Sequence, residues 1–402
     1  MSADSVSSDQ VAARTGWAVF GHGFRPFFLI AGSWAFIAIP LWVAFLHGAT
    51  LPDGPLPPLR WHVHEMLAGF IGAALMGFLL TAVPNWTGRR GYAGLPLIVL
   101  SGLFLAARLV LLPGSPVPLG LAAAVALLPL PALLLTVLPA LVKARTARLY
   151  GPPALVLAFW AGDLLMLADV AGWWAGGFRQ GQMLALDVAL LLVGLIGGRI
   201  VPSFTLNALR KAGKPAVLHP LPGVDRAAVL SLLAVALTDL VAPDGVAAGL
   251  AAGAAAVLTL LRLSRWHGLS TLGQPILWVL HLAYFLVPAS LAAKSVFLLT
   301  GLGWAGGWLH LQSVGAIALM ILAVMTRATL GHTGRDLLAA PPVVLAYLLL
   351  LGAALTRAFA PFLWPGLGAY GVAGALWAAS FALFLAVFAP MLLRSRPDGK
   401  PG

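Results

Sequence analysis

Long apolar segments recur along the whole chain, separated by short segments that collect the polar and charged residues. A helix of about 20 apolar residues crosses the hydrocarbon core of a bilayer, whereas a membrane barrel shows short segments of alternating polarity. The pattern predicts an all-α polytopic membrane protein with about twelve transmembrane helices. The predicted spans run approximately over residues 26–46, 63–83, 93–113, 117–142, 153–175, 183–205, 226–242, 245–263, 274–297, 308–326, 340–360 and 368–393.

Composition supports the membrane class. Hydrophobic residues make up 61% of the chain and charged residues 9%, which is more apolar surface than a soluble core can hide. We expect a disordered N-terminal tail over residues 1–20, a single twelve-helix membrane domain over 21–393, and a C-terminal tail over 394–402. The first tail lacks the basic, then apolar, then cleavable order of a signal peptide.

The net charge of +12 is distributed unevenly between alternate loops. Lys and Arg gather after the second, fourth, sixth, eighth and tenth predicted spans, where Arg262 is expected in a loop. The opposite loops are expected to hold only Arg60, Arg179, Lys294 and Arg357. By the positive-inside rule, the basic loops and both termini are predicted to be cytoplasmic. Because topology accounts for the basic excess, we expect the lipid bilayer and no nucleic acid as a partner.

A short internal match suggests a repeat. His64 precedes Arg89 by 25 positions, and His310 precedes Arg335 by the same 25. These pairs fall in the second and tenth spans, and the sixth ends in a similar glycine-rich sequence without the first histidine. One hypothesis is three four-helix units whose second helices face one another, and the alternative is a chance match in a Leu, Ala and Gly-rich chain.

The histidines fall in two predicted layers. His62, His64 and His310 lie at the predicted outer ends of their helices, and Glu65, the chain's only glutamate, directly follows His64. His22 and His332 lie at the predicted inner face. The chain has no cysteine, so imidazole is the leading ligand for copper or haem iron.

We therefore predict a copper site at His62, His64 and His310. On an ideal helix His62 and His64 point about 200° apart, so they share a metal only if His62 lies in an irregular helix entry. His281 lies roughly 12 Å inside the ninth span, and we predict it as a haem ligand with His22 or His332 as its partner. The alternative for each histidine is a helix cap or a bond to a neighbouring carbonyl.

Arginines near the inner ends of spans form a second candidate set. Guanidinium groups bind carboxylates in a bidentate manner, so Arg25, Arg89, Arg327 and Arg335 are candidates for haem propionates, with topology alone as the alternative. Four further charged residues, Asp163, Asp169, Asp187 and Arg108, lie within predicted spans. They must face the helix bundle and can pair or relay protons.

Several long motifs together identify a resemblance. They are GFRPFFLIAG at 23–32, WHVHEMLAGF at 61–70, AVPNWTGR at 82–89, GGRIVPSFT at 197–205, LHLAY at 280–284 and AVMTRATLGHTGR at 323–335. In this order they resemble the NnrS family of haem- and copper-containing bacterial membrane proteins. The resemblance implies a multi-pass inner-membrane protein that carries haem b and copper and acts in nitric oxide metabolism or tolerance.

The leading hypothesis is therefore a haem and copper protein of the nitrosative-stress response, with nitric oxide or a related small molecule as its partner. Catalysis and sensing both remain open, and no docking feature for an electron donor can be read from the chain. The alternative is a twelve-span secondary transporter of the facilitator type, and a third hypothesis is an assembly factor for respiratory enzymes.

Overall fold

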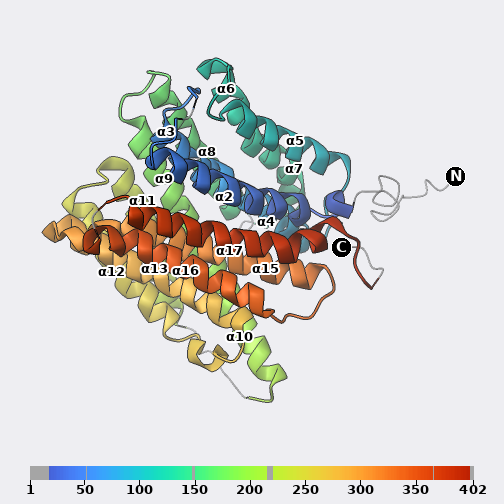
Figure 1. Ribbon diagram of the computed structural model, residues 1–402. Coiled ribbons are helices and arrows are strands. Elements are labelled where there is room, and N and C mark those ends of the chain that lie inside the picture. Colours follow the sequence, from blue (N-terminus) through green and yellow to red (C-terminus); the bar gives the residue numbers. More distant parts are fainter. Residues whose placement is uncertain (1–17, 51, 147–149, 215–220, 365, 399–402) are drawn as a thin grey trace. The chain divides into compact units, whose positions relative to one another are not determined.

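The structure, a computed structural model, describes residues 18–50, 52–146, 150–214, 221–364 and 366–398 (Figure 1). All regular elements within these ranges are helices, which confirms the predicted all-α class. Most of the predicted N-terminal tail, residues 1–17, and the last residues, 399–402, lie outside the described ranges. The last three residues of the predicted tail, Ala18–Phe20, form a short 3-10 helix, η1.

The helices follow one another with short connections. In the first half of the chain they are α2 (Phe24–Leu46), α3 (Pro58–His64), α4 (Gly72–Thr87), α5 (Leu95–Val110), α6 (Leu119–Ala126), α7 (Pro129–Ala144), α8 (Gly151–Val170) and α9 (Gly177–Leu192). In the second half they are α10 (Gly198–Lys211), α11 (Pro222–Val241), α12 (Val246–Leu263), α13 (Pro275–Thr300), α14 (Trp308–His310), α15 (Leu319–His332), α16 (Pro341–Leu363) and α17 (Gly368–Leu393). Two short 3-10 helices, η5 (Gly268–Thr271) and η6 (Gly303–Gly307), lie on either side of α13.

Ten helical segments in the described part of the chain are long and apolar enough to cross a membrane, so the chain is a multi-pass membrane protein. The other two predicted spans also form helices. One is α5, which has only 16 residues, and the other is α11, which has 20 residues but carries Asp225, Arg226 and Asp239. Each predicted segment is therefore helical, while the count of twelve and the orientation of the termini stay predictions.

The sequence marks many helix ends. Proline stands in the first turn of α3, α5, α7, α8, α11, α13 and α16, where its missing N–H costs no hydrogen bond. Gly88 ends α4 with φ +64°, and Gly301 ends α13 with φ +71°. This left-handed conformation is easiest for glycine and terminates the helix.

Three π-helical segments interrupt the α-helices. They are η2 (Glu65–Ile71), η4 (Val193–Gly197) and η7 (Leu311–Ala318), and they fall in the second, sixth and tenth predicted spans. Segment η2 begins directly after His64, and η7 begins directly after His310. The spans grouped by the repeat hypothesis thus share a rare local structure that often accompanies functional sites.

The chain packs as two compact units. Unit 1 comprises Met1–Phe178, Met325–Leu337 and Phe381–Gly402, and unit 2 comprises Arg179–Val324 and Leu338–Ser380. In unit 1, α2 packs along α4 (Figure 1). A Cβ at Gly77 of α4 would lie 2.9 Å from the Phe28 ring, so the small residue permits this close approach. In unit 2, α13 packs against the alanine-rich α12 and against η7.

The first long helix and the C-terminal segment of unit 1 are joined by one arginine. Arg25 is buried, and its Nη1 donates to the carbonyls of Met391, Leu392 and Arg394 at 3.2, 3.1 and 2.7 Å. These residues end α17, where carbonyls lack partners within the helix and attract positive charge. The motif around Arg25 therefore has a structural role in unit 1.

We expect Arg25→Gln to lower the free energy of unfolding by about 2 kcal/mol, because hydrogen bonds from a charged donor are lost at the end of α17. Thermal unfolding of the purified protein in detergent measures this as a fall of several degrees in Tm. Arg90→Gln, at an exposed position after α4, is the matched control and should leave Tm unchanged. Equal Tm values for both variants would contradict the capping role.

Candidate functional site

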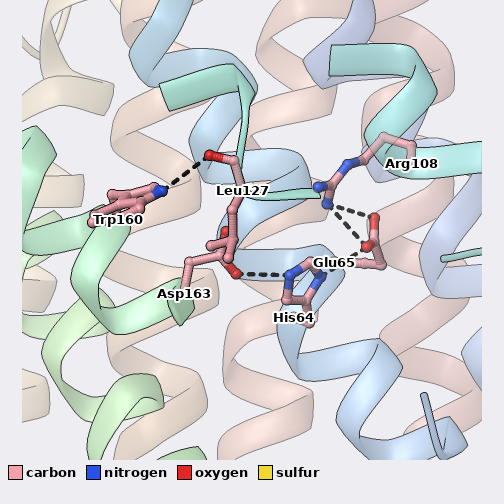
Figure 2. A network of polar contacts seen from close by, with 6 residues as sticks. All are labelled: His64, Glu65, Arg108, Leu127, Trp160 and Asp163. Carbon is pink, nitrogen blue, oxygen red and sulfur yellow. Dashed lines mark hydrogen bonds and ion pairs between the residues drawn. The ribbon is translucent and has the colours of Figure 1, made fainter. Parts of the chain in front are cut away.

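A buried network of four charged or polar side chains lies inside unit 1 (Figure 2). His64 ends α3 and Glu65 begins η2, Arg108 comes from the last turn of α5, and Asp163 comes from α8. The exposed fraction of each residue is 2% or less. Four segments of the first half of the chain thus place their polar groups at one point in an apolar interior.

Carboxylates lie against both ring nitrogens of His64. Nδ1 is 2.9 Å from Glu65 Oε1, and Nε2 is at the ion-pair distance of 2.7 Å from Asp163 Oδ1 (Figure 2). Arg108 Nη1 donates to both Glu65 oxygens, at 2.9 and 3.0 Å. The contact of Nε2 with Asp163 Oδ1 is an ion-pair contact without hydrogen-bond geometry. Ionised carboxylates only accept hydrogen bonds, so both contacts favour the form of His64 in which each ring nitrogen carries a proton. Two cations then balance two anions, and the buried network is neutral.

Small and aromatic residues enclose this network. A Cβ at Gly69 of η2 would lie 2.9 Å from Glu65 Oε2, so glycine leaves room for the carboxylate. On the other side of the network, Trp160 Nε1 donates to the carbonyl of Leu127 at 3.0 Å (Figure 2). The network is therefore closely packed in the described structure.

This arrangement bears on the predicted copper ligands. A metal binds a deprotonated ring nitrogen, and in unit 1 both nitrogens of His64 face carboxylates. His62 instead stacks on Trp42, with ring centroids 4.6 Å apart and planes 8° apart. His310 belongs to unit 2, at the start of η7. Among the described residues no group of three or more His, Asp or Glu side chains is placed to hold one metal ion, and the copper site stays a prediction.

A second cluster of unit 1 brings together His22 and His332, which the sequence placed at the inner face. Their rings stack with centroids 5.4 Å apart, and Phe24 packs against both. His22 Nδ1 is buried and has no hydrogen-bond partner in the described part of the chain. Burial first, then the nearby His332 and Arg25, lowers the pKa of His22 from 6.5 to about 3. His22 is therefore neutral at physiological pH, the form in which imidazole binds metals.

Arginines surround the histidine pair. Arg335 and Arg396 lie close enough to Arg25 to act on its charge, and Arg396 Nη1 donates to the carbonyl of His332 at 2.9 Å. Arg396 also pairs with Asp398. Of the predicted propionate ligands, Arg25 and Arg335 thus lie in this cluster. Arg89 is exposed after α4, and Arg327 is half-buried in α15.

His281, the predicted haem ligand, lies in unit 2. Its Nε2 is 2.8 Å from Thr205 Oγ1, and the edge of the ring faces Trp266. Nδ1 is close to the backbone of Gly268, where an added Cβ would lie 2.9 Å away. His281 is 7% exposed, and its contact with the Thr205 hydroxyl is neither a helix cap nor a bond to a neighbouring carbonyl, the alternatives that its sequence position left open.

Two of the acids predicted within spans form ion pairs, and two cations lie elsewhere than the sequence predicted. Asp163 pairs with His64, and Asp169 lies 2.7 Å from Arg60. The expectation that Arg262 and Lys294 lie in loops was wrong, because both are buried within helices. Arg262 of α12 donates to the carbonyl of Gly194 in η4 at 2.6 Å and pairs with Asp225 at 3.0 Å.

Sequence reasoning also missed that Lys294 and Asp239 form an ion pair inside unit 2. Lys294 was counted with the loops opposite the basic ones in the topology argument, although it stands within an apolar segment. The signal that could have found the pair is the position of each residue inside a predicted span, where an ionised side chain requires a partner.

These features define a class of protein: a polytopic helical membrane protein whose interior holds ion-paired side chains and a neutral, arginine-flanked histidine pair. Residues 18–396 match the family described as NnrS protein, and the chain belongs to the NnrS family. Membership suggests a role linked to the nitric oxide response. A search of curated proteins found no match.

We expect Arg108→Met to lower the free energy of unfolding by about 3–5 kcal/mol, because it leaves the Glu65 carboxylate buried without its cation. The double variant Glu65→Gln, Arg108→Met should lose less than the sum of the two single variants, because it removes both charges. Unfolding in detergent measures each value.

Arg179→Met is the control for this cycle. Arg179 pairs with Asp244 at the surface of unit 2, so its loss should cost about 0–1 kcal/mol. Strictly additive effects of the Glu65 and Arg108 substitutions would show that the two side chains do not act as a pair.

Proposed function

We propose that this NnrS-family chain is a haem b- and copper-binding protein of the bacterial inner membrane that acts in the response to nitric oxide. The observation that carries the haem part is the stacked pair of His22 and His332 with its surrounding arginines. Nδ1 of His22 is buried and has no hydrogen-bond partner among the residues that the structure describes. The family match supports the link to nitric oxide.

The residues of this cluster suit a histidine-ligated haem. His22 is a neutral imidazole, and the nearby Arg25 and Arg335 offer positive charge to propionates. A bound haem would supply an iron that binds nitric oxide. The polypeptide would hold the haem through these imidazoles and neutralise its carboxylates with the arginines.

His281 is the second candidate ligand. Its Nε2 contacts Thr205, so binding iron through this nitrogen requires Thr205 to give up that contact. Nδ1 of His281 has no hydrogen-bond partner among the described residues, as is also true of Nδ1 of His22, but it lies against the backbone of Gly268. We rank His22 ahead of His281 because His22 has a second imidazole, that of His332, stacked beside it.

Copper fits less well at the described positions of its predicted ligands. A metal at His64 requires Asp163 or Glu65 to leave a ring nitrogen and requires the ring to lose a proton. The copper part of the proposal therefore rests on the family resemblance, with His62, His64 and His310 as its candidate ligands. Copper per protein in His62→Ala, His64→Ala and His310→Ala variants tests it.

We expect His22→Ala and His332→Ala to lower the haem content of purified protein and to change its absorption spectrum, because each removes an imidazole of the stacked pair. Nitric oxide added to the reduced wild-type protein should produce a nitrosyl-haem spectrum. His47→Ala is the control, since His47 is exposed and its Nδ1 lies 2.9 Å from the carbonyl oxygen of Val43. Wild-type haem content and spectra in both cluster variants would rule out this placement.

We expect Arg335→Gln to loosen haem and shift its reduction potential, because a charge-assisted hydrogen bond contributes about 1.5–3 kcal/mol. A redox titration and the rate of haem transfer to apomyoglobin measure the two effects. Arg90→Gln and Arg89→Gln, at exposed positions after α4, serve as comparisons and should change neither. If the three variants retain haem equally, membrane topology alone explains why an arginine stands at position 335.

The alternative function, a secondary transporter, has one observation in its favour. Ionisable residues buried inside membrane helices often mark ion or proton pathways, and each unit contains such a group. A purified protein that stays colourless after expression with ample haem and iron would favour this alternative over the haem protein.

A further inference from the structure

A second buried polar cluster lies inside unit 2. Asp187 comes from α9, Asp239 from α11, Lys294 from α13 and Gln312 from η7. Asp187 is 2% exposed, and the other three are 0% exposed. Four separate segments thus bring two carboxyls, one ammonium and one amide to one enclosed point.

The contacts link the four side chains of the cluster one after another. Lys294 Nζ makes an ion pair with Asp239 Oδ2 and lies 4.7 Å from the centre of the Trp308 ring. Asp239 lies close enough to Asp187 for their charges to act on each other. Gln312 Nε2 then reaches Asp187 Oδ1 at 3.5 Å. The two acids are therefore neighbours, and only one of them has the lysine as a direct partner.

The cluster contains buried acceptors without donors. Asp187 Oδ2, Asp239 Oδ1 and Gln312 Oε1 have no hydrogen-bond partner within the described residues. Buried polar atoms are nearly always satisfied, so each exception needs an explanation. Because these three atoms are all oxygens, what they lack is a donor proton or a cation.

Charge points to the same deficit. If all three titratable groups are ionised, two carboxylates face one ammonium and the cluster carries a net charge of −1. An uncompensated charge is costly inside apolar surroundings, and two neighbouring carboxylates repel each other. One added proton makes the cluster neutral and supplies a hydrogen bond between the acids.

We propose that this cluster is an intramembrane proton-binding site, in which Asp187 and Asp239 hold one proton between them and Lys294 is the fixed countercharge. Gln312 orients Asp187 through its amide group. The site contains none of the candidate haem or copper ligands, and the proposal does not depend on haem or copper binding.

The position of the cluster suits proton exchange with one face of unit 2. Asp239 lies two residues before the end of α11, and Lys294 lies six residues before the end of α13. At about 1.5 Å per residue, these positions are roughly 3 and 9 Å from their helix ends. By the predicted topology these ends face outward, so the proton would exchange with the outer side.

Infrared spectroscopy of the protein in lipid nanodiscs tests the proposal, because the carbonyl stretch of a protonated carboxylic acid is distinct from that of a carboxylate. We expect wild-type protein at neutral pH to show one such band that Asp187→Asn abolishes. Asp239→Asn should abolish it as well, since Asp187 then pairs with Lys294 as a carboxylate. Asp244→Asn, in an exposed ion pair, should leave the band unchanged.

Lys294→Met provides a test in the opposite direction. Without the ammonium, both acids are expected to be protonated, and the intensity assigned to the pair should rise about twofold. If this variant does not fold, the comparison of the wild-type band with that of the near-isosteric Asp187→Asn variant tests the proposal alone. A wild-type protein without the band, or a band that persists in Asp187→Asn, would overturn the proposal.

A bound sodium ion is the other way to satisfy these oxygens, and the same variants distinguish it. Thermal unfolding in sodium chloride is compared with unfolding in choline chloride at equal ionic strength. We expect equal Tm values in the two salts. A higher Tm in sodium that is lost in Asp187→Asn but kept in Asp244→Asn would replace the proton with sodium and overturn the assignment.

Discussion

The cost of placing charge in an apolar interior determines how both units are built. In unit 1, Arg108 and His64 lie against Glu65 and Asp163, so the charges balance within one closely packed network. In unit 2, Lys294 balances only one of the neighbouring acids Asp239 and Asp187. The first network balances its charges with its own side chains, whereas the second lacks one positive charge, and this difference in charge separates a structural network from a candidate proton site.

Both networks involve the beginning of a π-helix. Glu65 is the first residue of η2, and Gln312 is the second residue of η7. A π-helical turn has a wider backbone than an α-helix and leaves carbonyls without their usual partners. Arg262 illustrates the consequence at the third segment, because it donates to the carbonyl of Gly194 within η4. The π-helices therefore lie where polar side chains enter otherwise apolar spans.

The histidine pair depends on residues that are far apart in the chain. His22 precedes α2, His332 ends α15, and the segment after α17 supplies Arg396 to the carbonyl of His332. Arg25 fixes the end of α17 beside them. The same arginine thus stabilises the fold of unit 1 and adds positive charge near the candidate haem ligands. Two physical roles therefore explain why an arginine stands at this position.

The sequence by itself determined the all-α membrane class, the location of each helical segment and the need for Asp163, Asp187 and Arg108 to face inward, because length and hydropathy act locally along a chain. It also placed His22 and His332 in one layer. Only the tertiary structure decided the partners: Glu65 for Arg108, Asp239 for Lys294 and the end of α17 for Arg25. A charged residue near a predicted span end can lie in a loop or pair inside the bundle, and the choice depends on which residue of another helix lies opposite. For that reason Lys294 and Arg262 were misplaced in loops, since hydropathy records the cost of burying a charge but not the distant partner that offsets it.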